Sequence, residues 1–360
     1  MRINPGLHVV DLSSSVRQIG LGEGALVLKG LQPHDLAFLA ALRSGLDDGT
    51  ETAAADRCGV PATRAGALLA ALDAVLLPWP GPAGRGQVQQ GPEVPALRAE
   101  RLGPDTARLA AAYRVDGTQF VRSRARAAVE ISGLGRTGAL LARTLAAAGV
   151  GTLILADPAV VRPTDVGPAY AFTDLGMGRA AAVKRHIYRV DPTIQVLVLA
   201  SGSVRPPTAH LDLSVCIGGP PLAGWTPGSS PRDYPQLTVT LQETGVDVGP
   251  LVVPGITPCL ECLERHCADS DSGWYAAAEA LSRGVSNAEA AGEETAAGMQ
   301  AAGAAAVQVL AFLDNVVQPA TWSAVLQLRA ADGYPGLKRV AFHPGCGCRL
   351  QRHGHAVRAS

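Results

Sequence analysis

The fold is decided by the stretch from Ala127 to Gly138, which reads AAVEISGLGRTG. Its first half, residues 127–132, is short and largely apolar, so it predicts a buried strand. Its second half places glycines in the pattern G-x-G-x-x-G, and a helical segment, residues 139–148, follows it. Glycines let the backbone turn tightly against a phosphate, and a helix N-terminus attracts negative charge. We therefore expect a dinucleotide-fold βαβ unit over residues 127–192, with this loop as its phosphate-binding turn.

An acidic residue supports this interpretation. The next apolar run, residues 152–156, ends at Asp157, which lies 24 residues after Gly133. A carboxylate at the end of this strand can accept the hydroxyl groups of a ribose. The pattern G-x-G-x-x-G is weak evidence by itself, and a βαβ turn that binds no ligand remains the alternative.

Alternation of strand-like and helical runs continues beyond the loop. It predicts an α/β domain with a doubly wound, mostly parallel Rossmann-like sheet that carries helices on both faces. Helices are expected at residues 179–189 and 295–313, and strands at residues 195–199, 211–217, 237–241 and 250–253. Two last apolar runs, residues 325–328 and 340–342, predict a closing hairpin.

The first 77 residues form a different pattern. Three short strand-like runs, residues 7–10, 16–19 and 25–28, precede three helical patterns that begin near Pro33, Glu51 and Pro61. This order predicts a small winged-helix α+β domain. Residues 78–96 are rich in Pro and Gly at their start and predict a linker, so the large domain is expected to cover residues 97–352.

Two cysteine pairs lie far apart in the sequence, at Cys259 with Cys262 and at Cys346 with Cys348. Two thiolates from each pair can complete a closed tetrahedral site, so we expect one structural Zn²⁺. Unrelated thiols are the alternative. Neighbouring side chains that can replace a ligand are His266, Cys267 and His343.

Composition narrows the class of protein. The 360 residues are 47% hydrophobic and 17% charged, with a formal net charge of zero. This balance gives no reason to expect nucleic acid or a membrane as partner. The N-terminus lacks a basic segment followed by a continuous apolar run, so we expect no signal peptide and a cytoplasmic location. In that compartment seven cysteines favour metal binding or free thiols over disulfides.

These features together resemble a known family. The run GLGRTGALLARTLAAAGVGTLILADPAVV, the later TPCLECLERH and the terminal HPGCGC are similar to the ThiF/MoeB adenylyltransferases, relatives of the ubiquitin-activating enzymes. The resemblance implies ATP with Mg²⁺ as a cofactor, adenylation of a C-terminal carboxylate on a small protein or peptide, and a homodimer. It also implies zinc at the four cysteines. On this chain the implied nucleotide-binding residues are Gly133, Gly135, Gly138, Asp157, Arg179 and Lys184.

The sequence departs from that family where catalysis would occur. Ala159 stands where the family has a second acid, and Pro168 lies in the segment where Asn and Arg are expected. Gly219 lies near the position of the family's metal-binding aspartate. Adenylation needs cations against the phosphates and a carboxylate to hold Mg²⁺. We therefore expect the fold to be kept and the adenylation site to be degenerate, with no catalytic residue assigned.

The first unit resembles a second class, the PqqD-type modules that bind leader peptides of ribosomally made natural products. A divergent ThiF-like domain with such a module is similar to actinobacterial proteins of bacteriocin and thiazole/oxazole peptide biosynthesis. The resemblance implies that the chain binds a precursor leader peptide and presents it to a YcaO-type cyclodehydratase. Strand addition needs an open sheet edge and apolar pockets, for which the expected residues are Leu26, Val27, Leu28, Leu68 and Leu72.

Two other functions remain open at this point. One is an active adenylyltransferase that uses Arg179, Lys184 and acids outside the recognised pattern. The other is a DNA-binding regulator, since residues 54–72 are compatible with a helix-turn-helix. Residues 1–77 carry a net charge of −2, which disfavours the regulator because DNA-binding faces depend on basic residues.

Overall fold

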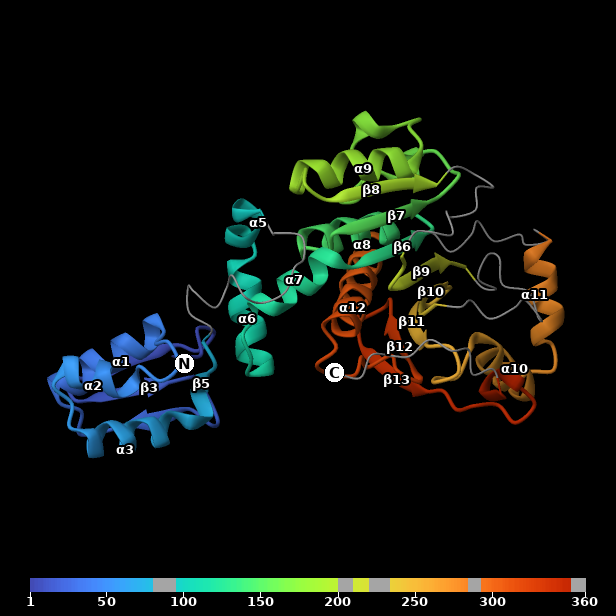
Figure 1. The fold of residues 1–360 in the computed structure, drawn as a ribbon. Coiled ribbons are helices and arrows are strands. Elements are labelled where there is room, and N and C mark those ends of the chain that lie inside the picture. The colour runs from blue at the N-terminus through green and yellow to red at the C-terminus, as the bar shows by residue number, and fades with distance from the viewer. Residues whose placement is uncertain (80–94, 200–209, 220–233, 284–292, 351–360) are drawn as a thin grey trace. The chain divides into compact units, whose positions relative to one another are not determined.

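The computed structural model describes residues 1–79, 95–199, 210–219, 234–283 and 293–350 (Figure 1). Contacts within the chain divide it into two compact units, Met1–Arg122 and Ser123–Ser360. The expected domain of residues 1–77 lies inside the first unit. Most of the expected linker, residues 80–94, lies outside the described residues.

The first unit begins with strands and continues with helices, in the order that the sequence predicts. A three-stranded antiparallel sheet has the order β2-β3-β4, and a small pair joins β1 to β5. The strands are β1 (Arg2–Ile3), β2 (Val9–Ser13), β3 (Val16–Ile19), β4 (Leu26–Leu28) and β5 (Leu76–Leu77). The helices are α1 (Pro33–Ser44), α2 (Glu51–Cys58), α3 (Ala62–Leu72), α5 (Ala96–Arg101) and α6 (Gly103–Tyr113), with a 3-10 turn, η1 (Asp73–Val75).

An apolar core and an ion pair with a buried carboxylate hold the first unit together. Phe38, Leu42 and Leu72 have no exposed surface. Asp35, also fully buried, accepts the N–H of Gln32 at the start of α1 and pairs with Arg64 of α3 at 2.9 Å. This carboxylate therefore joins two helices of the same core.

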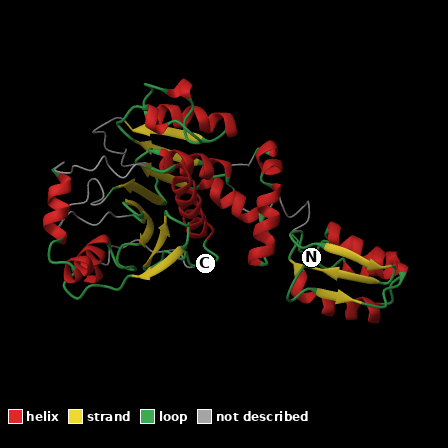
Figure 2. Cartoon of the chain, turned by 180° about the vertical axis from the view of Figure 1, so that it is seen from behind, coloured by secondary structure: helices red, strands yellow, loops and turns green. Residues whose placement is uncertain are grey.

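The second unit is built on one eight-stranded sheet, with the order β13-β12-β11-β10-β9-β6-β7-β8 (Figure 2). Strands β8, β7, β6, β9 and β10 are parallel, and β11, β12 and β13 extend the sheet as antiparallel strands. The strands are β6 (Ala128–Ser132), β7 (Thr152–Ala156), β8 (Gln195–Leu199), β9 (Leu213–Gly218), β10 (Gln236–Gln242), β11 (Gly245–Val252), β12 (Ala324–Arg329) and β13 (Pro335–Arg339). The expected mainly parallel α/β sheet is thus present.

Three helices pack together against one face of this sheet: α8 (Arg136–Ala147), α9 (Arg179–Val190) and α12 (Thr295–Asp314) (Figure 1). Helix α12 is long and apolar enough to cross a membrane by length and composition. Its residues Ala301, Ala305 and Val309 have no exposed surface and belong to the same apolar core as α8 and the strands. The small side chains of α12 thus allow it to pack closely against α8.

The remaining elements of the second unit are α7 (Thr118–Arg126), which crosses the boundary between the units, α10 (Leu260–Ser270) and α11 (Trp274–Ser282). Short 3-10 turns lie at η2 (Pro163–Asp165), η3 (Phe172–Asp174) and η4 (Gly347–Leu350). Arg124 of α7 forms a buried bidentate ion pair with Asp314 at the end of α12, at 2.8 and 2.6 Å.

The structure differs from the sequence-based expectation at several boundaries. Helix α8 begins at Arg136 rather than residue 139, because Gly135 inside the loop is its N-cap. Strand β11 begins at Gly245 rather than residue 250. The last strand, Pro335–Arg339, precedes the expected residues 340–342. This strand is mostly exposed and polar, so it carries no hydrophobic pattern.

Candidate functional site: the glycine loop and the cysteine cluster

The glycine loop lies where the strand order of the sheet reverses. Strands β6, β7 and β8 follow one another in one direction, whereas β9 pairs with the other side of β6. The loop connects β6 to α8, and a Cβ on Gly133 would lie 2.1 Å from the carbonyl oxygen of Ile217 on β9. Ligands of doubly wound sheets bind at this reversal, outside the carboxyl ends of the strands. The expected nucleotide loop is therefore in the expected place.

Two glycines of the loop are required by the backbone, and the third lies against a side chain. Gly133 has a φ of +87°, in the left-handed region that favours glycine. A Cβ on Gly138 would lie 1.9 Å from the carbonyl oxygen of Gly133, so the helix can begin this close only without a side chain. A Cβ on Gly135 would lie 1.8 Å from Oε1 of Glu293, a side chain from the start of α12.

Asp157, the expected ribose-binding acid, instead braces the loop. Its Oδ2 accepts the N–H of Leu134 at 2.6 Å, and its Oδ1 accepts the N–H of Ala159 at 2.8 Å. The side chain is only 6% exposed. Little of its carboxylate surface is left to accept a ligand's hydroxyl groups.

Arg179, the expected phosphate-binding cation, is held by two carboxylates. Its Nη2 lies 2.7 and 2.9 Å from the two oxygens of Asp165, and its Nη1 lies 3.4 Å from Asp157. Burial lowers the pKa of Arg179, but the hydrogen bond and negative charge of Asp165 outweigh burial and raise it. The guanidinium is therefore charged, and that charge is balanced within the protein.

Lys184, the second expected cation, lies further along α9. Its Nζ is 5.6 Å from the ring centroid of Tyr188. In the part of the chain that the structure describes, Lys184 forms no ion pair and no hydrogen bond with the glycine loop. The structure thus does not bring Lys184 to the loop by any described contact.

The positions that depart from the family pattern offer only backbone groups. The carbonyl oxygen of Pro168 accepts a hydrogen bond from Arg143 at 2.6 Å. Gly219 is exposed at the end of β9, and space around its Cα is open. Neither position supplies the cation or the carboxylate that adenylation requires.

Glu293 is the residue of this site that the sequence did not reveal. Its carboxylate accepts the N–H of Thr137 in the first turn of α8. The guanidinium of Arg136 donates to the carbonyl oxygen of Glu293 at 2.9 Å and to Oγ1 of Thr295 at 3.0 Å. The only sequence signal is a second glutamate beside Glu294, directly before a long helix, and such a pair usually indicates a helix cap.

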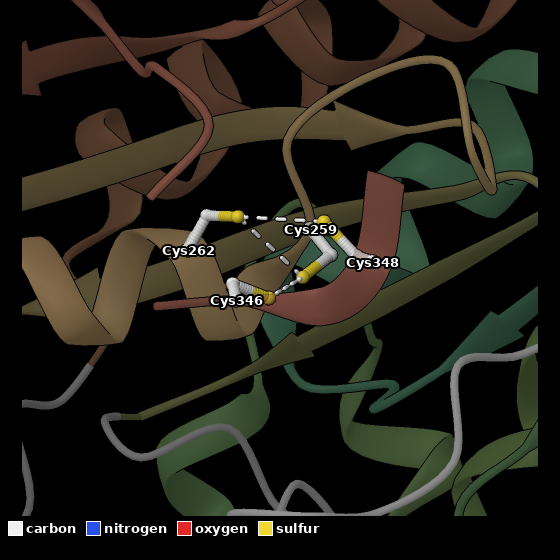
Figure 3. A group of neighbouring side chains, drawn as sticks. All are labelled: Cys259, Cys262, Cys346 and Cys348. Atoms are coloured by element: carbon white, nitrogen blue, oxygen red, sulfur yellow. Dashed lines mark hydrogen bonds between the residues drawn. The ribbon is translucent and has the colours of Figure 1, made fainter. Parts of the chain in front are cut away.

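The four cysteines that the sequence pairs come together in space (Figure 3). Their sulfur atoms lie within 4.8 Å of one another, and separations of 3.9, 3.6 and 3.5 Å join Cys259 to Cys262, Cys259 to Cys346 and Cys262 to Cys348. All four are free thiols. A tetrahedron of sulfurs around zinc at about 2.3 Å has edges of about 3.8 Å. The cluster therefore has the donor set and spacing of a closed four-sulfur metal site and can bind a metal ion.

Burial and the neighbouring groups change the acidity of three of these thiols. Burial raises the pKa of Cys259, and it raises the pKa of Cys348 to about 11. Burial opposes ionisation of Cys262 too, but the N–H of His343 and the neighbouring thiols outweigh it and lower its pKa. Four thiolates this close need a bound cation, which deprotonates coordinating thiols.

A second group, His266, Asp269 and His343, lies next to the cysteine cluster. Nδ1 of His343 accepts the N–H of Gly345 at 3.0 Å, so its Nε2 carries the proton and donates to Asp269 at 2.9 Å. His266 donates through Nε2 to the carbonyl oxygen of Ala341 at 3.1 Å. Both nitrogens of His343 are thus used, and the group joins α10 to the loop that carries Cys346. Cys267, whose pKa is raised by burial, is not one of the four clustered cysteines.

The residues expected to bind peptide divide into two kinds. Strand β4 pairs only with β3 among the described strands, so its other edge is open. Val27 is 41% exposed on this strand and Leu26 is half-buried, whereas Leu28, Leu68 and Leu72 belong to the core of the first unit. Only Leu26 and Val27 therefore offer apolar surface to a partner in this conformation.

Comparisons with known proteins agree with this architecture. Residues 107–207 match the ThiF family, whereas no curated protein matches the chain by sequence. The chain is similar in structure to E. coli MccB bound to ATP, with 16% identity, a TM-score of 0.65 and coverage of 96% of this chain and 98% of that one. The microcin C7 biosynthetic enzyme MccB in complex with N-formylated MccA gives 16% identity, a TM-score of 0.67 and coverage of 97% and 99%. PaaA gives 16% identity, a TM-score of 0.59 and coverage of 77% and 92%. At this identity the likeness establishes a shared fold.

Proposed function

We propose that this chain recruits a precursor peptide in ribosomal peptide natural-product biosynthesis, and that its own adenylation site is degenerate. The first unit, a winged-helix module in this proposal, binds the leader peptide. The ThiF-like unit presents the bound precursor to a YcaO-type cyclodehydratase, which consumes the ATP. The observation that carries the proposal is the state of the glycine loop, where the N–H groups of Leu134 and Thr137 and the guanidinium of Arg179 are already bound to carboxylates of the chain itself.

The charges around the loop support the loss of adenylation. Arg179 is paired with Asp157 and Asp165, Arg136 is bound to carbonyl and hydroxyl oxygens near α12, and Arg143 is bound to Pro168. An adenylyltransferase needs such cations free to stabilise charge that develops on the phosphates. Each of these arginines would have to give up its present partners first.

The open edge of β4 supports peptide binding. An added strand gains affinity from main-chain hydrogen bonds and specificity from neighbouring side chains. The similar structure of a microcin biosynthetic enzyme with N-formylated MccA supports a peptide partner for this fold. In the same proposal the four cysteines hold one structural zinc, and the chain forms a homodimer in the cytoplasm.

Peptide binding is tested with two matched variants at the two edges of one sheet. Val27→Asp places a charge on β4, and Leu12→Asp places one on β2, where Leu12 is 54% exposed. The probes are fluorescent synthetic peptides that match short reading frames beside the gene. We expect Val27→Asp to weaken binding by about tenfold or more, because a charge on an edge disfavours strand addition, and Leu12→Asp to leave it unchanged. Equal loss in both variants, or in neither, would rule out strand addition at β4.

Adenylation is tested separately by pyrophosphate exchange. The wild-type chain is incubated with ATP, Mg²⁺, labelled pyrophosphate and the bound peptide. We expect no exchange above background. Exchange that depends on the peptide's carboxylate would establish an active adenylyltransferase and would end the proposal of a degenerate site.

A further inference from the structure

The start of α8 already holds an anion. Helix N-termini leave their first N–H groups without partners inside the helix, and these groups bind phosphates in dinucleotide folds. Here the N–H of Thr137 donates to the carboxylate of Glu293. Oε1 of the same carboxylate lies beside Gly135, 1.8 Å from the place where a Cβ would be. Glu293 therefore fills the space that a phosphate would enter.

The backbone around Glu293 is held from both sides. Arg136 of α8 donates to the carbonyl oxygen of Glu293 and to Oγ1 of Thr295. The next residue, Glu294, caps α12 by accepting the N–H groups of Ala296 and Ala297, both at 2.9 Å. Two successive glutamates thus cap two different helices, and the packing of α8 against α12 fixes where Glu293 lies.

A hollow lies beside this contact. It has a volume of about 160 Å³, and its lining includes Thr137, Gly298, Glu243, Glu293 and Glu294. Thr137 has no exposed surface, and its Oγ1 has no hydrogen-bond partner among the described residues. A buried hydroxyl without a partner is costly, so it marks a place where a polar ligand or water belongs.

We propose that Glu293 is an internal competitor for phosphate, an autoinhibitory carboxylate that keeps nucleoside triphosphates and pyrophosphate out of the glycine loop. Removing this carboxylate frees the N–H of Thr137 and the space beside Gly135. The inference deepens the proposed function, because it names the group that closes the site. It does not depend on which peptide the first unit binds.

The test measures binding of inorganic pyrophosphate, and of ATP with Mg²⁺, by isothermal titration calorimetry. The chains compared are the full-length wild type, Glu293→Ala, Glu293→Gln and the control Glu294→Ala. We expect Glu293→Ala to bind pyrophosphate about tenfold or more tightly than the wild type, because a charge-assisted contact at a helix N-terminus no longer has to be displaced. Glu293→Gln should gain less, since its amide oxygen still fills the space. Glu294→Ala should resemble the wild type.

Equal pyrophosphate binding by the wild type and Glu293→Ala would overturn the inference. An equal gain in Glu293→Ala and Glu294→Ala would also overturn it, because the effect would then be one of overall charge. If Glu293→Ala fails to fold, the NMR amide signal of Thr137 is followed in Glu293→Gln instead. On addition of pyrophosphate this signal should shift more than in the wild type. Equal shifts in the two proteins would refute the inference. Equal peptide binding by Val27→Asp, Leu12→Asp and the wild type would contradict the proposed function and leave this inference untouched, so failure of one is distinguishable from failure of the other.

Discussion

The cysteine cluster and the glycine loop, both in the second unit, differ in how their polar groups are satisfied. At the cluster, four sulfur donors converge. At the glycine loop, two N–H groups and the cation of Arg179 are already bound within the protein, by Asp157, Glu293 and Asp165. The first site has the donor set to bind a metal ion, whereas at the second several groups that would face a nucleotide already have partners within the protein.

The largest effect is expected from breaking the cysteine cluster. Cys346→Ser should lose the bound metal and lower the melting temperature by about 10 °C or more, because a closed metal site contributes several kcal/mol of folding free energy. Mass spectrometry measures the metal content, and calorimetry measures the melting temperature. The control is Cys267→Ser, which keeps the four clustered cysteines. A Cys346→Ser protein without metal that unfolds at the wild-type temperature would show that the cluster is not a structural metal site.

A smaller loss of stability is expected from breaking the ion pairs beside the glycine loop. Arg179→Met should lower the free energy of unfolding by roughly 2–4 kcal/mol, because Asp165 and Asp157 would remain buried without a counter-ion. Adding Asp165→Asn to Arg179→Met should restore part of this loss. Urea unfolding followed by circular dichroism measures both variants. If Arg179→Met were as stable as the wild type, the ion pairs of Arg179 would not stabilise the segment beside the glycine loop.

The smallest effect concerns Asp174, in the segment between β7 and α9 near the glycine loop. It is fully buried and contacts Arg185, His186 (2.7 Å) and the N–H of Ala171 (2.7 Å). Burial would raise its pKa, but the hydrogen bond from His186 and the other contacts outweigh burial and lower the pKa. Its stabilisation is therefore complete above the unfolded-state pKa of about 4 and is lost as the pH falls toward the lower folded-state pKa.

Asp174→Asn should consequently lower the free energy of unfolding by roughly 1–3 kcal/mol at pH 7. The difference from the wild type should shrink below about pH 4. Denaturant unfolding at pH 7, 5 and 3.5 measures it. A difference that is the same at all three values would show that ionisation of Asp174 is not its source.

Sequence patterns predicted the elements whose hydrophobic residues are buried in a regular strand or helix. Residues 152–156 are a strand as expected, and helix α12 covers the expected Ala-rich run. The patterns missed α5, α6, α7, α10 and α11, and they placed the last strand too late in the chain. These elements are short or largely exposed, so their side chains show little of the periodicity that burial imposes.

The sequence alone determined the two pairs of cysteines and the glycine turn, because ligand spacing and backbone freedom are properties of neighbouring residues. It also predicted a degenerate adenylation site, from departures from the family pattern at Ala159, Pro168 and Gly219. Only the tertiary structure decided what occupies the start of α8. Glu293 lies more than 150 residues after Thr137, and it reaches the glycine loop because α12 packs against α8. Local patterns do not report such a contact, since it depends on how two distant helices meet.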